Sequence, residues 1–325
     1  MDVIVNLFCA AVLAGTPLLF GTLGEILTEK SGNLNLGVEG MMFMGAISGL
    51  AGALFYENLF SVPGGIPAAV LAVVFSFLFG MLGALIYSFL TVTLRANQNV
   101  TGLALTIFGT GFGNFFGDVI GGRSASGYAA VGAATKAVFQ NIRIPYLSDI
   151  PYLGKLLFSY NFLVYLGIAV AVTMAVFLNK TRTGLNLRAV GEDPAAADAA
   201  GINVTKYKYF ATCIGGGICG IGGMYISMVI CSGVWVNNCV SGMGWIAVAL
   251  VIFATWSPSR ALLGSLVFGG LSIMRMYIPL GIPSQIYDIF PYLATVIVLI
   301  ATGIRQSREH AIPKSTGVNY FREER

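Results

Sequence analysis

Long apolar stretches alternate with short polar segments along almost the whole chain, and each approaches the ~20 residues that a helix needs to cross a bilayer. Nine such stretches lie approximately at 3–24, 36–56, 66–92, 99–119, 159–178, 206–231, 243–256, 261–278 and 288–304. In lipid, a continuous segment must satisfy its own backbone hydrogen bonds, which an α-helix does. The pattern therefore predicts an all-α, polytopic membrane protein with about nine transmembrane helices.

Basic residues predict the orientation of these spans, because lysine and arginine accumulate in cytoplasmic loops. With the N-terminus outside, the outer loops hold only Arg123, Lys136, Arg143 and Lys155. Arg275 falls within a span, and every other one of the 18 basic residues falls on the inner side. We therefore expect the N-terminus outside and the C-terminus in the cytoplasm.

Two longer polar segments interrupt the expected transmembrane domain of residues 1–304. Residues 121–158 are expected to form an external loop, either a lid or docking ledge or a plain connector with an interfacial helix. Residues 179–205 are expected to form a cytoplasmic loop. Residues 305–325 form a polar cytoplasmic tail, which we expect to be poorly ordered.

Composition agrees with a membrane location. Apolar residues make up 56% of the 325 residues and charged residues 10%, and the mean hydropathy is +0.81, far from globular values. The net charge of +4 follows the loops, so we expect lipid and no nucleic acid as a partner. The five cysteines form no CxxC pair, and no metal site is expected. Cys231 and Cys239 can bridge in an outer loop or pack as small apolar groups.

A short run inside the loop of residues 179–205 carries a complete set of helix-boundary signals. Asp193 can cap the first free N–H groups, Pro194 suits the first helical position, and Gly201 suits a left-handed stop. The residues between them are mostly alanine, the best helix former. A helix of about two turns is marginal alone in water. The pattern predicts that a soluble partner holds it, the alternative being a surface helix without one.

Glycine is the other organising residue of the spans, with 42 in the chain. Gly109, Gly113 and Gly117 repeat at intervals of four, and so do Gly216 and Gly220. Small residues at this interval let helix backbones approach closely in lipid. We expect close helix–helix contacts along both stripes.

Motifs for nucleotide chemistry or catalysis find no support. Residues 215–220 formally match GxGxxG, but no strand precedes them, and no GxxxxGK[ST] loop occurs. Any ATP must therefore be bound by another subunit. Tyr287 and Asp288 match the first half of an intramembrane aspartyl protease signature, whose second half is absent; the only histidine, His310, lies in the tail. We expect no enzyme, no catalytic residue and no cofactor in this chain.

Two stretches carry a resemblance to one family. They are 24–42, GEILTEKSGNLNLGVEGMM, and 188–203, RAVGEDPAAADAAGIN. With its span pattern and length, the chain resembles the inner-membrane permease subunits of bacterial ABC importers of the ribose and branched-chain amino-acid type. Within these it is most similar to the nucleoside branch, whose systems use a Bmp-like substrate-binding lipoprotein.

The resemblance implies a mechanism. In such permeases the loop matching residues 188–203 contains a coupling helix that docks on the ATP-binding subunit, which binds ATP and Mg. Two permease subunits, often non-identical, enclose the path, and import proceeds by alternating access. The matching coupling residues are Arg188, Gly191, Glu192, Asp193, Pro194, Ala197 and Gly201.

Polar residues within spans are candidates for the substrate pathway, because such groups are costly in lipid. Glu39 can accept hydrogen bonds from a ribose or base, or be satisfied by neighbouring helix backbone. Asn97, with Gln98 and Asn99, can line the inner mouth of the path or simply make the turn. Asn114 can read a polar substrate group or bond another helix.

Asp118 and Arg275 lie near the outer ends of their spans. An arginine at this depth requires a partner, so we expect an ion pair or an outer gate between them. Swapping both charges is expected to rescue what either single swap destroys.

Nucleosides or purines are the expected cargo, with a simple sugar or a riboflavin-type vitamin as alternatives. A stand-alone secondary transporter or channel is the alternative from another class. It would usually show paired intramembrane charges, which are few here, and it leaves the loop of residues 179–205 unexplained.

Overall fold

The computed structural model describes residues 2–60, 64–124, 127–142, 145, 148, 150, 152–277, 283–305 and 312–321. Their regular structure is helical, apart from one antiparallel bridge between Ala130 and Val234. The elements are α1 (Asp2–Glu29), α2 (Val38–Phe60), α3 (Gly65–Ser88), η1 (Phe89–Thr93), α4 (Gln98–Arg123), α5 (Ala133–Val138), α6 (Leu153–Phe158), α7 (Phe162–Lys180), α8 (Arg182–Glu192), α9 (Pro194–Ala199), α10 (Val204–Tyr225), η2 (Ile226–Ile230), α11 (Met243–Phe253), α12 (Pro258–Tyr277) and α13 (Ser284–Arg305).

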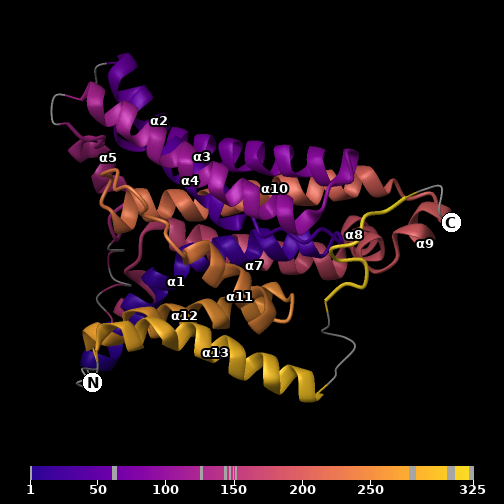
Figure 1. The fold of residues 1–325 in the computed structure, drawn as a ribbon. Coiled ribbons are helices and arrows are strands. Elements are labelled where there is room, and N and C mark those ends of the chain that lie inside the picture. The colour runs from indigo at the N-terminus through magenta and orange to yellow at the C-terminus, as the bar shows by residue number, and fades with distance from the viewer. Residues whose placement is uncertain are drawn as a thin grey trace.

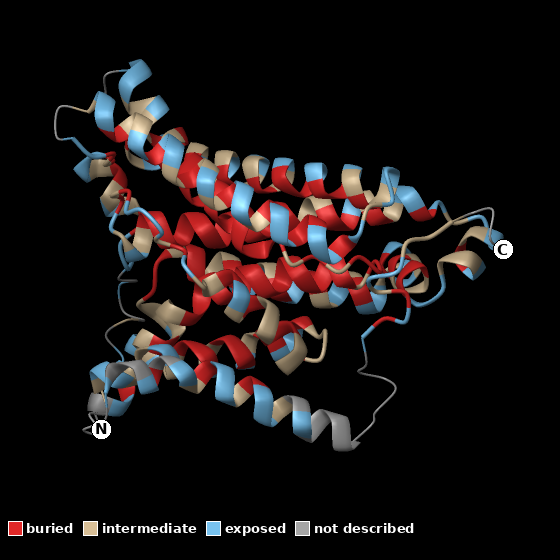
Figure 2. Cartoon of the chain, viewed as in Figure 1, coloured by how far each residue is buried: buried red, intermediate tan, exposed pale blue. Residues whose placement is uncertain are grey.

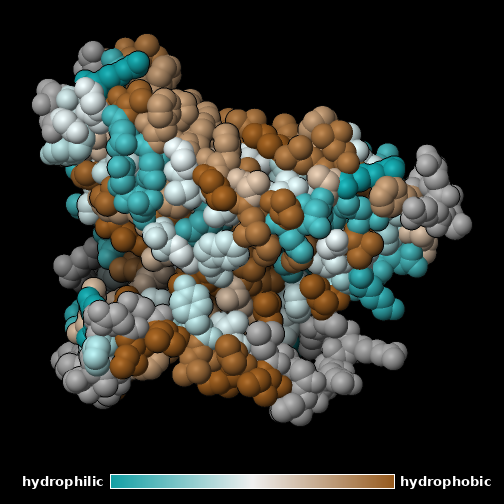
Figure 3. All heavy atoms as spheres, in the orientation of Figure 1, coloured by the Kyte–Doolittle hydropathy of each residue, from teal (hydrophilic) through white to brown (hydrophobic). Residues whose placement is uncertain are grey.

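The long helices run side by side in one bundle (Figure 1). Helices α8 and α9 lie at one end, called here the α9 end, and α5 lies at the other, called the α5 end (Figure 1). Figure 3 shows hydrophilic side chains gathered near both ends and apolar ones along the flanks. On α3, Val70, Val74, Leu78 and Leu82 are all exposed at intervals of four. Such a stripe suits contact with lipid.

Six described helices are long and apolar enough to cross a membrane. They are Ile4–Glu29, Val38–Phe60, Gly65–Thr93, Gln98–Arg123, Phe162–Lys180 and Val204–Ile230. The three remaining predicted spans fall on α11, α12 and α13, and α11 has only 11 residues. At 1.5 Å per residue α11 covers roughly half of the ~30 Å hydrocarbon core. The total of nine spans and the orientation of the termini stay predictions.

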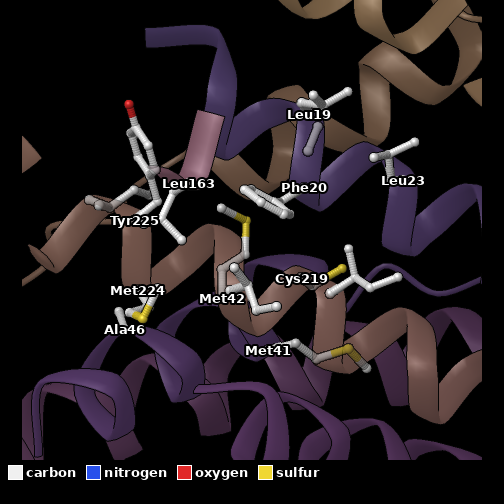
Figure 4. Packing of buried hydrophobic residues seen from close by; sticks show 14 of the residues in the cluster. Leu19, Phe20, Leu23, Met41, Met42, Ala46, Leu163, Cys219, Met224 and Tyr225 are labelled. Carbon is white, nitrogen blue, oxygen red and sulfur yellow. The ribbon is translucent and has the colours of Figure 1, made fainter. Parts of the chain in front are cut away.

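Side chains from α1, α2 and α10 fill the centre of the bundle. Figure 2 shows buried residues concentrated there, with exposed ones on the outer helices. Phe20 of α1, Met42 of α2 and Met224 of α10 belong to this core and are at most 1% exposed (Figure 4). Because apolar groups have no hydrophobic drive to associate within lipid, close packing of this kind holds the helices together.

Both predicted glycine stripes lie at close helix contacts. A methyl group at Gly109 would collide with the backbone of Gly40, and one at Gly220 with the carbonyl oxygen of Ser76. Gly117 is covered by the indole of Trp235. The close approach that the spacing predicts is therefore confirmed.

Candidate functional site: the α2–α11 junction and the α9 end

Glu39 joins two helices that are far apart in sequence. It lies in the first turn of α2 and is 5% exposed. Its Oε1 accepts the N–H of Gly242 and its Oε2 accepts that of Gly244, both at 2.7 Å. These N–H groups begin α11, and Gly242 has a φ of +84°. We call Glu39, Gly242 and Gly244 the α2–α11 junction. A negative carboxylate at this position stabilises the partial positive charge at the N-terminus of α11.

The junction lies well inside the bundle. Gly40, next to Glu39, packs on Gly109, which is near the middle of the 26-residue α4. Helix α11 therefore begins at a depth that a span usually crosses without interruption. Interrupted helices of this kind are typical of transporter binding sites near the membrane midplane.

The segment that leads into α11 descends along α4. Trp235 lies on Gly117 and donates to Asn237 Oδ1 at 2.8 Å. Asn238 exchanges two hydrogen bonds with Asn114, at 2.9 and 3.1 Å. Asn114 therefore bonds the turn before α11, and its expected role in reading substrate stays a prediction. Trp235 is 7% exposed, so its ring packs inside the protein.

Asp118 also hydrogen-bonds the segment that leads into α11. Its Oδ1 accepts from Asn237 Nδ2 at 3.0 Å. Arg275 is exposed on α12, and within the described residues the structure shows no ion pair between the two. Their pairing stays a prediction. Cys231 and Cys239, in the segment between η2 and α11, are free thiols.

The polar turn before α4 has divided roles. Asn97 caps the helix by accepting the N–H of Val100 at 3.1 Å, which is the turn-forming alternative. Gln98 is buried, accepts the N–H of Leu34 at 2.7 Å, and donates to Asn319 at 3.2 Å. Asn99 is exposed. Of the three, Gln98 connects elements, whereas sequence reasoning favoured its neighbours.

Two carboxylates escaped the sequence analysis. The expected first span ended at residue 24, but α1 continues to Glu29 and buries both Glu25 and Glu29. Glu25 accepts from the backbone N–H and Nδ2 of Asn35, each at 3.1 Å. Glu29 accepts from Trp256 Nε1. The signal was present, since two glutamates four residues apart lie on one helix face.

Trp256 reaches Glu29 because α11 stops early. The predicted span extended to residue 256, but the helix ends at Phe253. Thr255 and Trp256 follow with φ values of 48° and 53°. This left-handed turn is uncommon for such residues, and the hydrogen bond to Glu29 holds Trp256 in place. The turn was not visible in the apolar pattern.

Helix α9 has the boundaries that the sequence predicts. Asp193 Oδ1 accepts the N–H of Ala196 at 2.9 Å, Pro194 is the first helical residue, and Gly201 has a φ of +82°. Ala197 is buried against Val190 of α8. Helix α8 itself was not predicted; Thr181 caps it by accepting the N–H of Gly184 at 3.0 Å. The six-residue α9 is thus supported by its own neighbour.

The end of α8 lies against the turn after α1. A methyl group at Gly191 would collide with the carbonyl oxygen of Lys30. Burial lowers the pKa of Lys30 from its ordinary value, an effect opposed by the charge of Glu192 and reinforced by Arg188. The buried Arg188 Nε has no hydrogen-bond partner among the described residues. Gly191 therefore permits close contact between the end of α8 and the turn after α1.

Part of the C-terminal tail is ordered, contrary to expectation. Ser315 donates through its N–H and its Oγ to the Gly191 carbonyl, at 3.1 and 2.6 Å. Asn319 donates to the Arg95 carbonyl at 2.6 Å, and Tyr320 to Asp198 Oδ2 at 2.7 Å. Residues 312–321 therefore tie the α8–α9 segment to the turn before α4. These long-range contacts order a segment whose polar composition predicted disorder.

Comparison with known proteins identifies the class. The pattern of the family described as branched-chain amino acid transport system / permease component matches residues 7–299. The chain belongs to this family. It is a permease subunit of an ABC transporter and a multi-pass integral membrane protein, and such subunits are not themselves enzymes.

Three relatives match over nearly their full length. The nucleoside ABC transporter permease protein NupC of Lactococcus lactis is 34% identical over 96% of this chain and 95% of its own. The guanosine ABC transporter permease protein NupQ of Bacillus subtilis is 34% identical, with 97% and 96% covered. The putative glucose ABC transporter permease protein TsgC13 of Haloferax volcanii is 35% identical, with 99% of both covered. No solved structure matches this chain.

Proposed function

We propose that this subunit imports nucleosides or free purines by alternating access, driven by a separate ATP-binding subunit. The observation that carries the proposal is the near-complete match to two permeases named for nucleoside and guanosine transport. The α9 end faces the cytoplasm in this proposal, in agreement with the distribution of lysine and arginine.

Helix α9 is the coupling helix of the proposal. Its capped start and glycine stop give it a defined shape, and Ala197 anchors it to α8. A movement of α9 reaches the membrane helices by two routes. One is the contact of Gly191 with Lys30, and the other is the ordered tail. The exposed Glu192 and Asp193 remain available to a docking subunit.

The α2–α11 junction is the proposed centre of the path. Both oxygens of Glu39 are engaged by α11, so its first role is to hold the two helix starts together. Asn114, one of the residues expected to line the path, holds the segment that leads into α11. Any displacement of α2 relative to α4 therefore moves the start of α11, and this is a physical route to alternating access.

Three partners complete the proposed transporter: an ATP-binding subunit that holds ATP and Mg, a second permease, and an extracytoplasmic substrate-binding lipoprotein. The second permease is proposed as a non-identical relative. Bacillus subtilis has two guanosine permease proteins similar to this chain, NupQ and NupP, the latter 28% identical over half of the chain.

Glucose is the second candidate cargo, because TsgC13 is as similar to this chain as the nucleoside permeases are. A ribose and a hexose present similar hydroxyl groups, so the polar residues described here do not separate them. The alternatives of a riboflavin-type vitamin and of a stand-alone transporter gain no support from these relatives.

Uptake measurements test the proposal. Cells that lack their own nucleoside and glucose uptake, and that express the chain with its partner subunits, are given radiolabelled guanosine or glucose. We expect guanosine uptake that disappears when the ATP-binding subunit is inactivated. Glucose uptake without guanosine uptake would show that the cargo is a sugar rather than a nucleoside. Uptake that survives inactivation of the ATP-binding subunit would refute the ATP-driven mechanism.

A further inference from the structure

A cavity of about 740 Å³ opens at the α9 end, away from the α2–α11 junction. Three parts of the chain form its walls. They are η1 with the turn at Arg95, the linker from α9 into the first turns of α10, and the ordered tail at Asn319 and Tyr320. The hydroxyl groups of Thr93 and Tyr209 hydrogen-bond at 2.5 Å and join η1 to α10. The cavity therefore sits where the coupling segment meets the membrane helices.

Lys208 is the unusual residue in this cavity. It lines the cavity and is only 3% exposed. Within the described residues, its ammonium group has neither a hydrogen-bond nor an ion-pair partner. A buried, unpaired ammonium group is strongly disfavoured, and natural proteins compensate it with an opposite charge. The fold has instead placed this group beside an open space.

The surroundings add positive charge. Lys206 and Arg95 also line the cavity. Asp198 is the one acid among the described lining residues, and its Oδ2 already accepts a hydrogen bond from Tyr320. Three cations thus face one carboxylate that is already engaged. One carboxylate or one phosphodiester headgroup would neutralise part of this positive excess, and a phosphate monoester or inorganic phosphate, which carries about −1.5 to −2 at neutral pH, would neutralise nearly all of it.

We propose that this cavity binds a phosphate-bearing anion, with Lys208 as its principal ligand and Lys206 and Arg95 at the rim. Lysine binds phosphate as a point charge. The same chemistry has two sources. Exposed Leu94 and Phe210, each next in sequence to a lining residue, suit the acyl chains of an anionic phospholipid whose headgroup enters the cavity. A soluble phosphorylated metabolite needs only the cavity itself.

The inference concerns a ligand other than the cargo, so it does not depend on which substrate is imported. Only the cytoplasmic origin of the ligand rests on the proposed orientation. Binding can be measured without transport, and a failure here would leave the proposed function intact. A phosphate group in the cavity would contact the α9–α10 linker, η1 and the tail together, and would therefore stiffen the coupling segment.

The test uses the transporter purified with its partner subunits. Wild type, Lys208→Met, Lys208→Arg and the matched control Lys180→Met are compared, Lys180 being an exposed lysine at the same end. One arm adds inorganic phosphate and measures the thermal unfolding midpoint of the permease. The other counts bound lipids by native mass spectrometry after reconstitution in phosphatidylglycerol or in phosphatidylcholine. Because the ATP-binding subunit has phosphate sites of its own, each result is read as a difference from Lys208→Met.

We expect wild type and Lys180→Met to bind alike, Lys208→Arg within about threefold of them, and Lys208→Met at least tenfold more weakly. A response to phosphate identifies a soluble ligand, and selective retention of phosphatidylglycerol identifies a headgroup. Equal binding by wild type and Lys208→Met in both arms would overturn the proposal.

Discussion

The α2–α11 junction and the α9 end both bury charged side chains, but they treat them in opposite ways. Glu39 has each of its oxygens engaged by a backbone N–H at 2.7 Å. Lys208 is equally buried and faces a cavity without a partner among the described residues. A charge that the fold itself satisfies acts as a structural joint, and a charge left open indicates a ligand. The difference distinguishes residues that stabilise the fold from residues that bind a ligand.

The largest loss of stability is expected at the α2–α11 junction. Glu39→Ala leaves two buried N–H groups without an acceptor, which costs about 3 kcal/mol or more. We expect a clear fall in the thermal unfolding midpoint of the purified complex. Glu39→Gln keeps one acceptor oxygen and serves as the matched comparison with a smaller fall. An unchanged unfolding midpoint in Glu39→Ala would show that the α2–α11 junction does not stabilise the fold.

Lys208→Met is expected to change stability in the direction opposite to Glu39→Ala. Removing an unpaired buried charge is expected to leave stability unchanged or to raise it in the absence of phosphate and anionic lipid. The measurement is again the thermal unfolding midpoint, in phosphate-free buffer and neutral detergent. A fall as large as that of Glu39→Ala would mean that Lys208 is satisfied by the fold after all.

Contact between α8 and the first helix is the next target. Gly191→Ala places a methyl group against the Lys30 carbonyl, and overpacking of this kind costs about 1–3 kcal/mol. We expect uptake to fall about tenfold while the protein still inserts. Gly111→Ala, a position with open space around it, is the control and should behave as wild type. Equal uptake by the two variants would exclude this contact from coupling.

The boundaries of α9 should matter more for coupling than for stability. Asp193→Ala removes a cap worth about 1 kcal/mol, and Gly201→Ala strains a residue with a φ of +82°. The double variant should remain inserted and hydrolyse ATP while uptake is lost. ATP hydrolysis and substrate uptake are measured on the same reconstituted vesicles. Unchanged uptake in a well-inserted double variant would refute the coupling assignment.

A small loss of uptake is expected from a change in the tail. Tyr320→Phe deletes one hydrogen bond to Asp198, worth about 1 kcal/mol. We expect a modest loss of uptake, less than that of Gly191→Ala. Val318→Ala alters an exposed tail residue and is the control. A larger loss in the control than in Tyr320→Phe would show that the tail acts by bulk rather than through this contact.

Several local features were accessible to sequence reasoning. The cap at Asp193, the stop at Gly201 and the close approach at Gly109 and Gly220 are confirmed. Each depends on groups a few residues apart or on a repeat along one helix, which a sequence displays directly. The resemblance also identified the family correctly. The early stop of α11 and the order in the tail were missed, because both depend on contacts made from elsewhere.

By itself, the sequence determined that this protein lies in a membrane and where its main helices run. These follow from hydropathy and helix boundaries, which are local properties of the chain. Only the tertiary structure decided that Glu39 meets Gly242, 203 residues away, and that Lys208 opens onto a cavity. The partner of a buried polar group depends on which distant backbone packs beside it, and no local pattern encodes that choice.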